Sequence, residues 1–151
     1  MKISVQSHDF DLAQEIFKMT NGRKDLGAIV TFTGLVRDIH AGKTIKKMTL
    51  EHFPGMAAQE LEKIALSSMK RWPLEDLTII HRYGPLLPGD NIVLVITTSH
   101  HREAAFEAAE YMMDWLKTDA PFWKLEETEE GEHWVGAKND DIERKKKWQK
   151  Q

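Results

Sequence analysis

The order in which strand-like and helix-like segments follow one another is the strongest constraint on the fold of this chain. Alternating or β-branched runs indicate strands, and apolar residues three and four positions apart indicate helices. The predicted strands cover residues 2–6, 27–36, 44–53, 77–83, 92–98, 122–127 and 133–137, and the predicted helices cover 11–19, 56–71 and 100–118. Because hairpins are mixed with helices, the order lacks the regular alternation of a doubly wound fold. It predicts an α+β fold with an antiparallel sheet and three main helices on one side of it.

Two pairs of neighbouring strands are predicted to form hairpins. Residues 27–36 and 44–53 are expected to pair antiparallel, with the polar segment RDIHAGK as a long charged tip. Residues 122–127 and 133–137 are expected to close around the acidic turn TEEGE. The segment PLLPGD supplies a further turn, because Pro, Gly and Asp favour turn conformations.

The length of 151 residues is that of one ordinary domain. We predict a single domain at 1–138, which lacks any internal linker or repeat. The segment 139–151 is charged and has no apolar periodicity, so it is predicted to be a flexible C-terminal tail.

Composition excludes several kinds of function. A formal net charge of -3 argues against nucleic acid as the main partner, since phosphate backbones bind clustered positive surfaces. The absence of cysteine excludes a disulfide framework and a cysteine nucleophile. No secretory signal and no long apolar run is present, which predicts a cytoplasmic protein without membrane contact. The seven histidines form no HxxxH or HExxH motif, so no metal site and no cofactor is predicted.

Two positions are candidates for binding an anion. His101 and Arg102 stand at the predicted start of the third long helix, where free backbone N–H groups and the helix dipole attract negative charge. Arginine can also grip a phosphate through two hydrogen bonds. Arg37 ends the strand at 27–36 and could line a cleft. The alternative interpretation is that Ser99 caps the helix and that these basic side chains are solvated surface groups.

Lys117 and Lys124 bracket the segment KTDAPFWK at the exit of the same helix. Its proline and two aromatic residues indicate a stiff, packed turn that could direct both amines into one pocket. Two neighbouring ammonium groups lower each other's pKa, which gives one neutral amine for proton transfer and one cation for charge stabilisation. The alternative is that Lys117 merely complements the helix dipole and that Lys124 is an ordinary surface lysine.

Five longer strings occur together and in one order: GAIVTFTGLVR, TLEHFPGM, HRYGPLLPGD, TSHHREAAFEAAEYMMDWLKTDAPFWK and EGEHWV. In this combination the chain resembles the large, catalytic subunit of molybdopterin synthase. The resemblance implies an α/β-hammerhead fold and a sulfurtransferase acting in molybdenum cofactor biosynthesis. The implied reaction inserts two sulfurs into cyclic pyranopterin monophosphate. The sulfur donor is the C-terminal Gly-Gly thiocarboxylate of a small ubiquitin-like subunit, and the large subunits form a homodimer within a heterotetramer.

The resemblance also implies roles for particular residues. Lys117 and Lys124 match the catalytic lysines of the family, and Arg37, His101 and Arg102 match its substrate and anion contacts. Lys138 stands where an arginine can reach the neighbouring subunit's pocket, and it keeps the charge without the bidentate geometry. Leu35 replaces a lysine that can occur at its position. A non-catalytic adaptor that docks a ubiquitin-like sulfur carrier is the competing interpretation.

Overall fold

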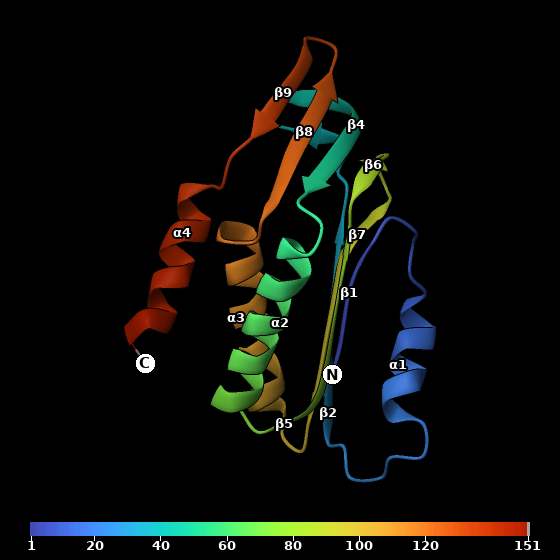
Figure 1. Cartoon of the computed structure of the whole chain (residues 1–151), viewed down its shortest axis with the longest axis vertical. Helices are drawn as coiled ribbons and strands as arrows, with labels where there is room; N and C mark the ends of the chain where they lie inside the picture. The colour runs from blue at the N-terminus through green and yellow to red at the C-terminus, as the bar shows by residue number, and fades with distance from the viewer. Residues whose placement is uncertain (151) are drawn as a thin grey trace.

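A mixed sheet of four strands forms the centre of the molecule (Figure 1). The computed structural model describes residues 1–150. The strands of this sheet are β1 (Lys2–Gln6), β2 (Ala28–Leu35), β5 (Leu74–Arg82) and β7 (Asn91–Ser99). Their order is β1-β5-β7-β2, with β1 and β5 parallel and the other neighbours antiparallel. The strand β2 therefore forms one edge of the sheet.

Helices cover both faces of this sheet. The helix α1 (Leu12–Thr20) lies on one face, and α2 (Met56–Arg71) and α3 (Arg102–Thr118) lie on the other (Figure 1). Successive residues of β5 explain the arrangement: Ile79 is buried in the cluster that includes α2 and α3, whereas Ile80 is buried with residues of α1. The prediction of helices on one side is wrong, because β5 and β7 are apolar on both faces and each face must be covered. No helix within residues 1–150 is long and apolar enough to cross a membrane.

A second sheet stands at one end of the first, at the top of Figure 1. Its strands are β3 (Ile39–His40), β4 (Lys43–His52), β6 (Gly84–Leu86), β8 (Phe122–Thr128) and β9 (Gly131–Val135). The order is β3-β4-β8-β9, and β6 pairs with β4. The predicted closing hairpin is confirmed, since β8 and β9 pair antiparallel with Lys124 opposite Val135.

The predicted hairpin between residues 27–36 and 44–53 is wrong. The strand β2 pairs with β7 along its whole length, and β4 pairs with β8 in the other sheet. The central strand β7 needs a partner on each side, and β2 satisfies its second row of hydrogen bonds. The actual hairpin is β3–β4, joined at Ala41 and Gly42, whose φ angles are 51° and 76°. Two successive positive φ angles are typical of the tight turns that match the twist of a hairpin.

The C-terminal segment contains a helix that its sequence does not suggest. Residues 139–150, predicted as part of a flexible tail, form α4 (Asn139–Lys146) and the short 3₁₀ helix η1 (Lys147–Lys150). The buried carboxylate of Asp114 on α3 holds both elements. It accepts hydrogen bonds from Arg144 Nε at 3.1 Å and from Trp148 Nε1 at 2.8 Å. The segment has no apolar stripe to bury, and these tertiary contacts with α3 order it instead.

Trp148 is expected to contribute strongly to stability, because its indole is only 7% exposed and packs edge-on against Trp72 and Tyr111. Trp148→Ala should lower the free energy of unfolding by about 3–5 kcal/mol. Urea unfolding followed by circular dichroism measures the effect. Ile142→Ala on α4 is the control, since Ile142 is 42% exposed and should change stability little. Equal midpoints for the two variants would show that this segment does not stabilise the domain.

Candidate active site

A pocket of about 300 Å³ opens between the end of the first sheet, the second sheet and the C-terminal turns of α3. Its floor includes a row of residues from three adjacent strands, since His81 pairs with Val93 and Val93 with Gly34. Gly34 lets the Val93 side chain pack closely on this row, because a Cβ at Gly34 would lie 2.8 Å from Val93 Cγ1. The larger apolar side chains of the lining include Phe32, Leu35, Ile45, Met48, Ile92, Met113, Leu116 and Phe122.

Both candidate lysines line this pocket. Lys117 lies in the last turn of α3, and the helix ends at the C-cap Asp119. A tight turn follows, in which the Phe122 amide donates to the Ala120 carbonyl at 2.8 Å. The chain then enters β8, which presents Lys124 to the same cavity. The stiff exit predicted from KTDAPFWK is therefore the element that brings the two amines to one pocket.

The amine of Lys124 is perturbed by its surroundings. Its pKa is lowered from 10.5 to about 8, first by burial and next by the charge of Lys117. The charge of Lys138 acts in the same direction, while Asp141 and Glu126 act in the opposite direction. A lysine with such a pKa is partly neutral near physiological pH, so Lys124 can accept or donate a proton there.

The structure brings some of the other predicted residues to this pocket and leaves two elsewhere. Arg37 and Lys138 line it beside the lysines. His101 and Arg102 are exposed at the opposite end of α3, which is about 25 Å long at 1.5 Å per residue. His101 is the N-cap and no side chain caps the helix. The alternative role of Ser99 as the cap is wrong, because its hydroxyl donates to the His101 carbonyl.

Three pocket residues were not identified from the sequence: Glu126, His40 and His81. Glu126 is buried and accepts a hydrogen bond from His40 Nδ1 at 2.9 Å. It follows Lys124 by two positions on β8, so strand periodicity places both on one face. That spacing was the available signal for Glu126. His40 and His81 come from distant strands and gave no local signal.

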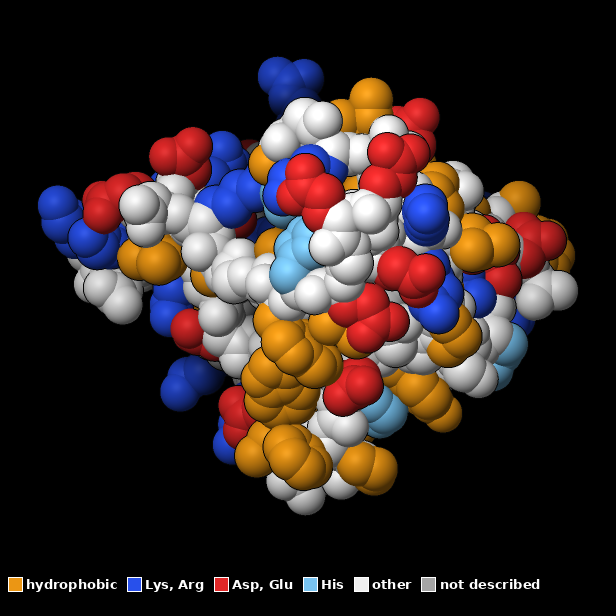
Figure 2. All heavy atoms as spheres, turned by 90° about the horizontal axis from the view of Figure 1, so that it is seen from above, with side chains coloured by type: hydrophobic (Ala, Val, Ile, Leu, Met, Phe, Trp, Pro, Cys, Tyr) orange, Lys and Arg blue, Asp and Glu red, His pale blue; other side chains and the backbone are white. Residues whose placement is uncertain are grey.

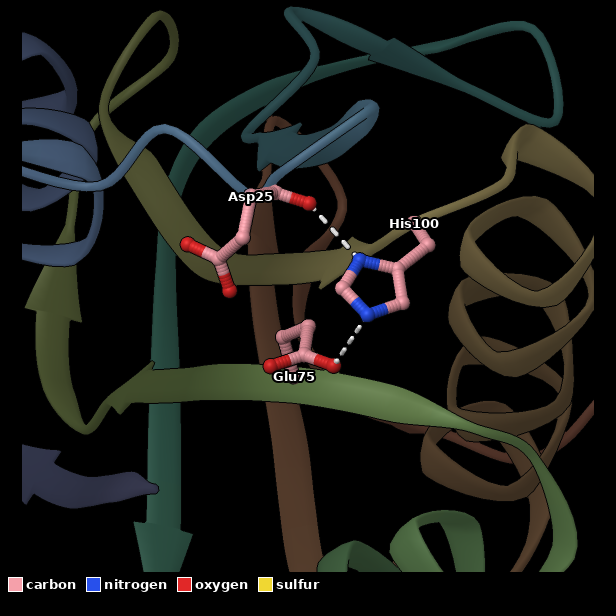
Figure 3. Close-up of side chains that lie close together, drawn as sticks. All are labelled: Asp25, Glu75 and His100. Carbon is pink, nitrogen blue, oxygen red and sulfur yellow. Dashed lines mark hydrogen bonds and ion pairs between the residues drawn. The ribbon is translucent and has the colours of Figure 1, made fainter.

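A separate cluster joins Asp25, Glu75 and His100, whose ligand-type atoms lie within 4.8 Å of one another (Figure 3). The His100 ring contacts the Asp25 carbonyl at 2.7 Å and the Glu75 carboxylate at 3.2 Å. Arg23 already bonds both carboxylates, at 2.6 Å to Asp25 and 2.9 Å to Glu75. The hydrogen bond from Arg23 lowers the pKa of Asp25 to about 2. We interpret the cluster as an ion-pair network that ties the segment before β2 to the first sheet.

Exposed aromatic side chains lie on the second sheet. Phe53, Trp123 and Trp134 line a surface groove, and Phe53 contacts Trp123 edge-on with ring centroids 5.3 Å apart. Figure 2 looks down on this end of the molecule and shows hydrophobic side chains gathered together there. Exposed aromatic groups of this kind are enriched at protein–protein interfaces.

The fold and the pocket define an α+β protein with a cavity lined by three lysines and an arginine. Residues 5–119 match the family model described as MoaE protein. The chain therefore belongs to the MoaE family. The predicted α+β fold, of the α/β-hammerhead type, is confirmed, with α4 as a helix beyond the three predicted ones.

The similarity extends over nearly the whole chain. The molybdopterin synthase catalytic subunit of Brucella melitensis biotype 1 is 51% identical over 151 residues, covering 99% of this chain and 91% of that protein. The molybdopterin biosynthesis MoaE protein of Burkholderia ambifaria superposes with a TM-score of 0.83 at 44% identity, covering 98% of this chain and 97% of that one. Molybdopterin synthase from Staphylococcus aureus gives a TM-score of 0.80 at 32% identity, covering 88% and 96%.

Proposed function

We propose that this chain is the catalytic subunit of a molybdopterin synthase, a cytoplasmic sulfurtransferase that converts cyclic pyranopterin monophosphate to molybdopterin. The observation that carries the proposal is the meeting of Lys117 and Lys124 in one pocket, where the pKa of Lys124 is lowered to about 8. The catalytic subunits similar to this chain over nearly its full length support it.

The pocket offers the groups that this reaction needs. The sulfur donor is the C-terminal Gly-Gly thiocarboxylate of a small ubiquitin-like subunit, and a tail ending in glycines is narrow enough to enter a pocket of about 300 Å³. Its negative charge is attracted by Lys117, Lys124 and Lys138 in the pocket lining. The donor sulfur attacks a side-chain carbon of the pterin, so a C–S bond forms while the bond from that carbon to a phosphate ester oxygen breaks and the cyclic phosphate opens. The sulfur is then held as a thioester to the partner's glycine. Water then breaks the acyl–sulfur bond, leaving sulfur on the pterin and a carboxylate on the partner.

The two lysines divide the charge and proton work of this reaction. Neutral Lys124 takes up the proton released when water attacks the thioester, and protonated Lys117 stabilises the developing oxyanion. Arg37 contacts the phosphate at the pocket mouth through its planar guanidinium. In a second round a fresh donor adds its sulfur to the adjacent side-chain carbonyl carbon, whose oxygen leaves as water, and hydrolysis of this second thioester completes the pair of sulfurs.

A second copy of the chain would supply His101 and Arg102. These residues cannot reach Lys117 in their own chain, because α3 separates them by about 25 Å. The edge strand β2 begins beside their turn, with Ala28 opposite Ser99, and it ends at the pocket, with Gly34 and Leu35 in the lining. Antiparallel pairing of β2 with β2 of another copy would place the α3 start of one chain at the pocket of the other. The edge carries the exposed apolar side chains Ile29 and Phe32, which such pairing would cover.

The test is direct reconstitution. Purified protein is mixed with cyclic pyranopterin monophosphate and the thiocarboxylated small subunit, and molybdopterin formation is measured. We expect product containing two sulfurs, and none when the small subunit carries an ordinary carboxylate. If the protein binds both the pterin and the small subunit but forms no molybdopterin, the result supports the role of a non-catalytic adaptor.

A further inference from the structure

His81 is a buried titratable group in the pocket that the reaction scheme above does not use. It lies near the end of β5, is 6% exposed and lines the cavity. Its ring stacks on Phe122, with ring centroids 3.7 Å apart and an interplanar angle of 11°. The stack and the surrounding strands fix the orientation of the imidazole.

One hydrogen bond determines which ring nitrogen carries the proton. His81 Nδ1 lies 2.9 Å from the Arg82 carbonyl oxygen. A carbonyl oxygen can only accept, so Nδ1 must donate and therefore bears the hydrogen. Within residues 1–150 no hydrogen bond reaches Nε2, and no buried side-chain nitrogen or oxygen lacks a partner. The Nε2 edge therefore faces the open pocket.

The surroundings keep this imidazole uncharged. Its pKa is lowered to about 4, mainly by burial. The hydrogen bond to Arg82 acts against this effect, and the charges of Lys124, Lys117 and His52 add to it. A histidine with that pKa holds no second proton near neutral pH, so it cannot act as a general acid. Its Nε2 lone pair remains a hydrogen-bond acceptor.

The other groups around the pocket are mostly donors. Arg37, Lys117, Lys124 and Lys138 have no acceptor when protonated. The two carboxylates in the lining are Glu126, which is bonded to His40, and Asp141 on α4, so His81 is the uncharged ring acceptor among these groups. A ligand that presents both an anionic group and ring N–H groups needs an acceptor as well as these cations. We propose that His81 determines substrate specificity in this pocket, by accepting through Nε2 a hydrogen bond from an N–H group of the pterin ring. This role rests on the proposed function and identifies the heterocycle as the part of the substrate that His81 contacts.

Three variants separate this role from a structural one. His81→Phe keeps the aromatic stack on Phe122 and removes the acceptor. His81→Gln can place its amide oxygen near the position of Nε2, whereas His81→Asn can reach only the position of Nδ1. The dissociation constant for cyclic pyranopterin monophosphate should rise at least about tenfold in the Phe and Asn variants, since a buried donor is left unpaired. The Gln variant should recover most of the affinity. Inorganic phosphate, which probes only the cations, should bind all four proteins alike.

A second measurement does not depend on activity. In protein labelled with ¹⁵N-histidine, NMR should show His81 as a neutral ring protonated at Nδ1 throughout pH 6–8, and the Nε2 resonance should shift when the pterin binds. Pterin binding that is unchanged in His81→Phe would overturn the assignment while leaving the proposed function intact. Titration of His81 between pH 6 and 8 would also overturn it. A wild-type protein that binds phosphate but no pterin would overturn the proposed function and this assignment together.

Discussion

Replacing Lys124 by alanine is expected to reduce kcat/KM for molybdopterin formation by about 10²–10⁴-fold, the range supplied by a positioned general acid or base. Lys124 combines burial, a charged neighbour and a place on the pocket wall, which are the conditions that lower a lysine pKa towards neutrality. Lys124→Arg should not restore the rate, because arginine stays protonated. Steady-state kinetics with the thiocarboxylated small subunit measure both variants.

The dependence of kcat/KM on pH also tests the role of Lys124, and the direction of the expected change follows from its pKa. With a pKa of about 8, the neutral fraction of Lys124 grows tenfold per pH unit below that value and levels off above it. The logarithm of kcat/KM for the wild type should therefore rise with pH and level off near pH 8. Lys117→Ala removes a positive neighbour, so it should move the remaining rise to higher pH. A wild-type rate that does not change from pH 6 to 9 would show that deprotonated Lys124 is not required.

Stability provides a control for these variants. In the unfolded chain Lys124 has an ordinary pKa of 10.5, so between about pH 8 and 10.5 the unfolded state binds more protons than the folded state. Wild-type stability should therefore gain a contribution from this lysine as pH rises through that window. Lys124→Met should lack that contribution and be at least as stable as the wild type at pH 7. If Lys124→Met is unfolded, its loss of activity says nothing about the role of the lysine. Lys124→Gln is then measured in place of Lys124→Met.

The elements themselves could be predicted well from the sequence, because their signals are local. The boundaries of β1, α2 and β8 follow from alternation, apolar spacing and Pro73. Which strands pair with one another could not be predicted, because the partner that accepts and donates a strand's backbone hydrogen bonds is distant in the sequence. Thus β2 pairs with β7 and leaves β4 to β8. Likewise, α4 has no apolar stripe and depends on Asp114, a buried carboxylate thirty-four residues before Trp148.

The site shows the same division between local and distant information. Lys117 and Lys124 could be predicted because one short, stiff segment carries both. Their pocket partners could not, because His40 and His81 reach the cavity from separate strands through tertiary packing. The resemblance supplied Arg37, His101 and Arg102 as a set without indicating their distances. Geometry separates that set, since Arg37 lines the pocket and the other two stand at the far end of α3.

That separation predicts a large effect in mixed dimers. One chain carries Lys124→Ala, and the other carries His101→Ala together with Arg102→Ala. A pure dimer, made of two copies of the same variant, is expected to have less than about a hundredth of wild-type activity. Both of its sites lack either the reacting lysine or the anion-binding pair. If the α3 start of one chain completes the pocket of the other, a hybrid dimer has one site with both defects and one intact site. Hybrids isolated through two different affinity tags should therefore recover about half of the wild-type activity.

The alternative arrangement gives the opposite result. If each pocket used His101 and Arg102 of its own chain, both sites of the hybrid would carry a defect and activity would stay at the level of the pure variants. A hybrid built from two Lys124→Ala chains with different tags controls for the purification and should be inactive in either case. Ile29→Lys on the edge strand should weaken dimer formation and activity together, because Ile29 is 42% exposed on β2 and lies away from the pocket lining. Recovery in the hybrid, lost again when Ile29→Lys is added to both chains, would assign the completed site to pairing through β2.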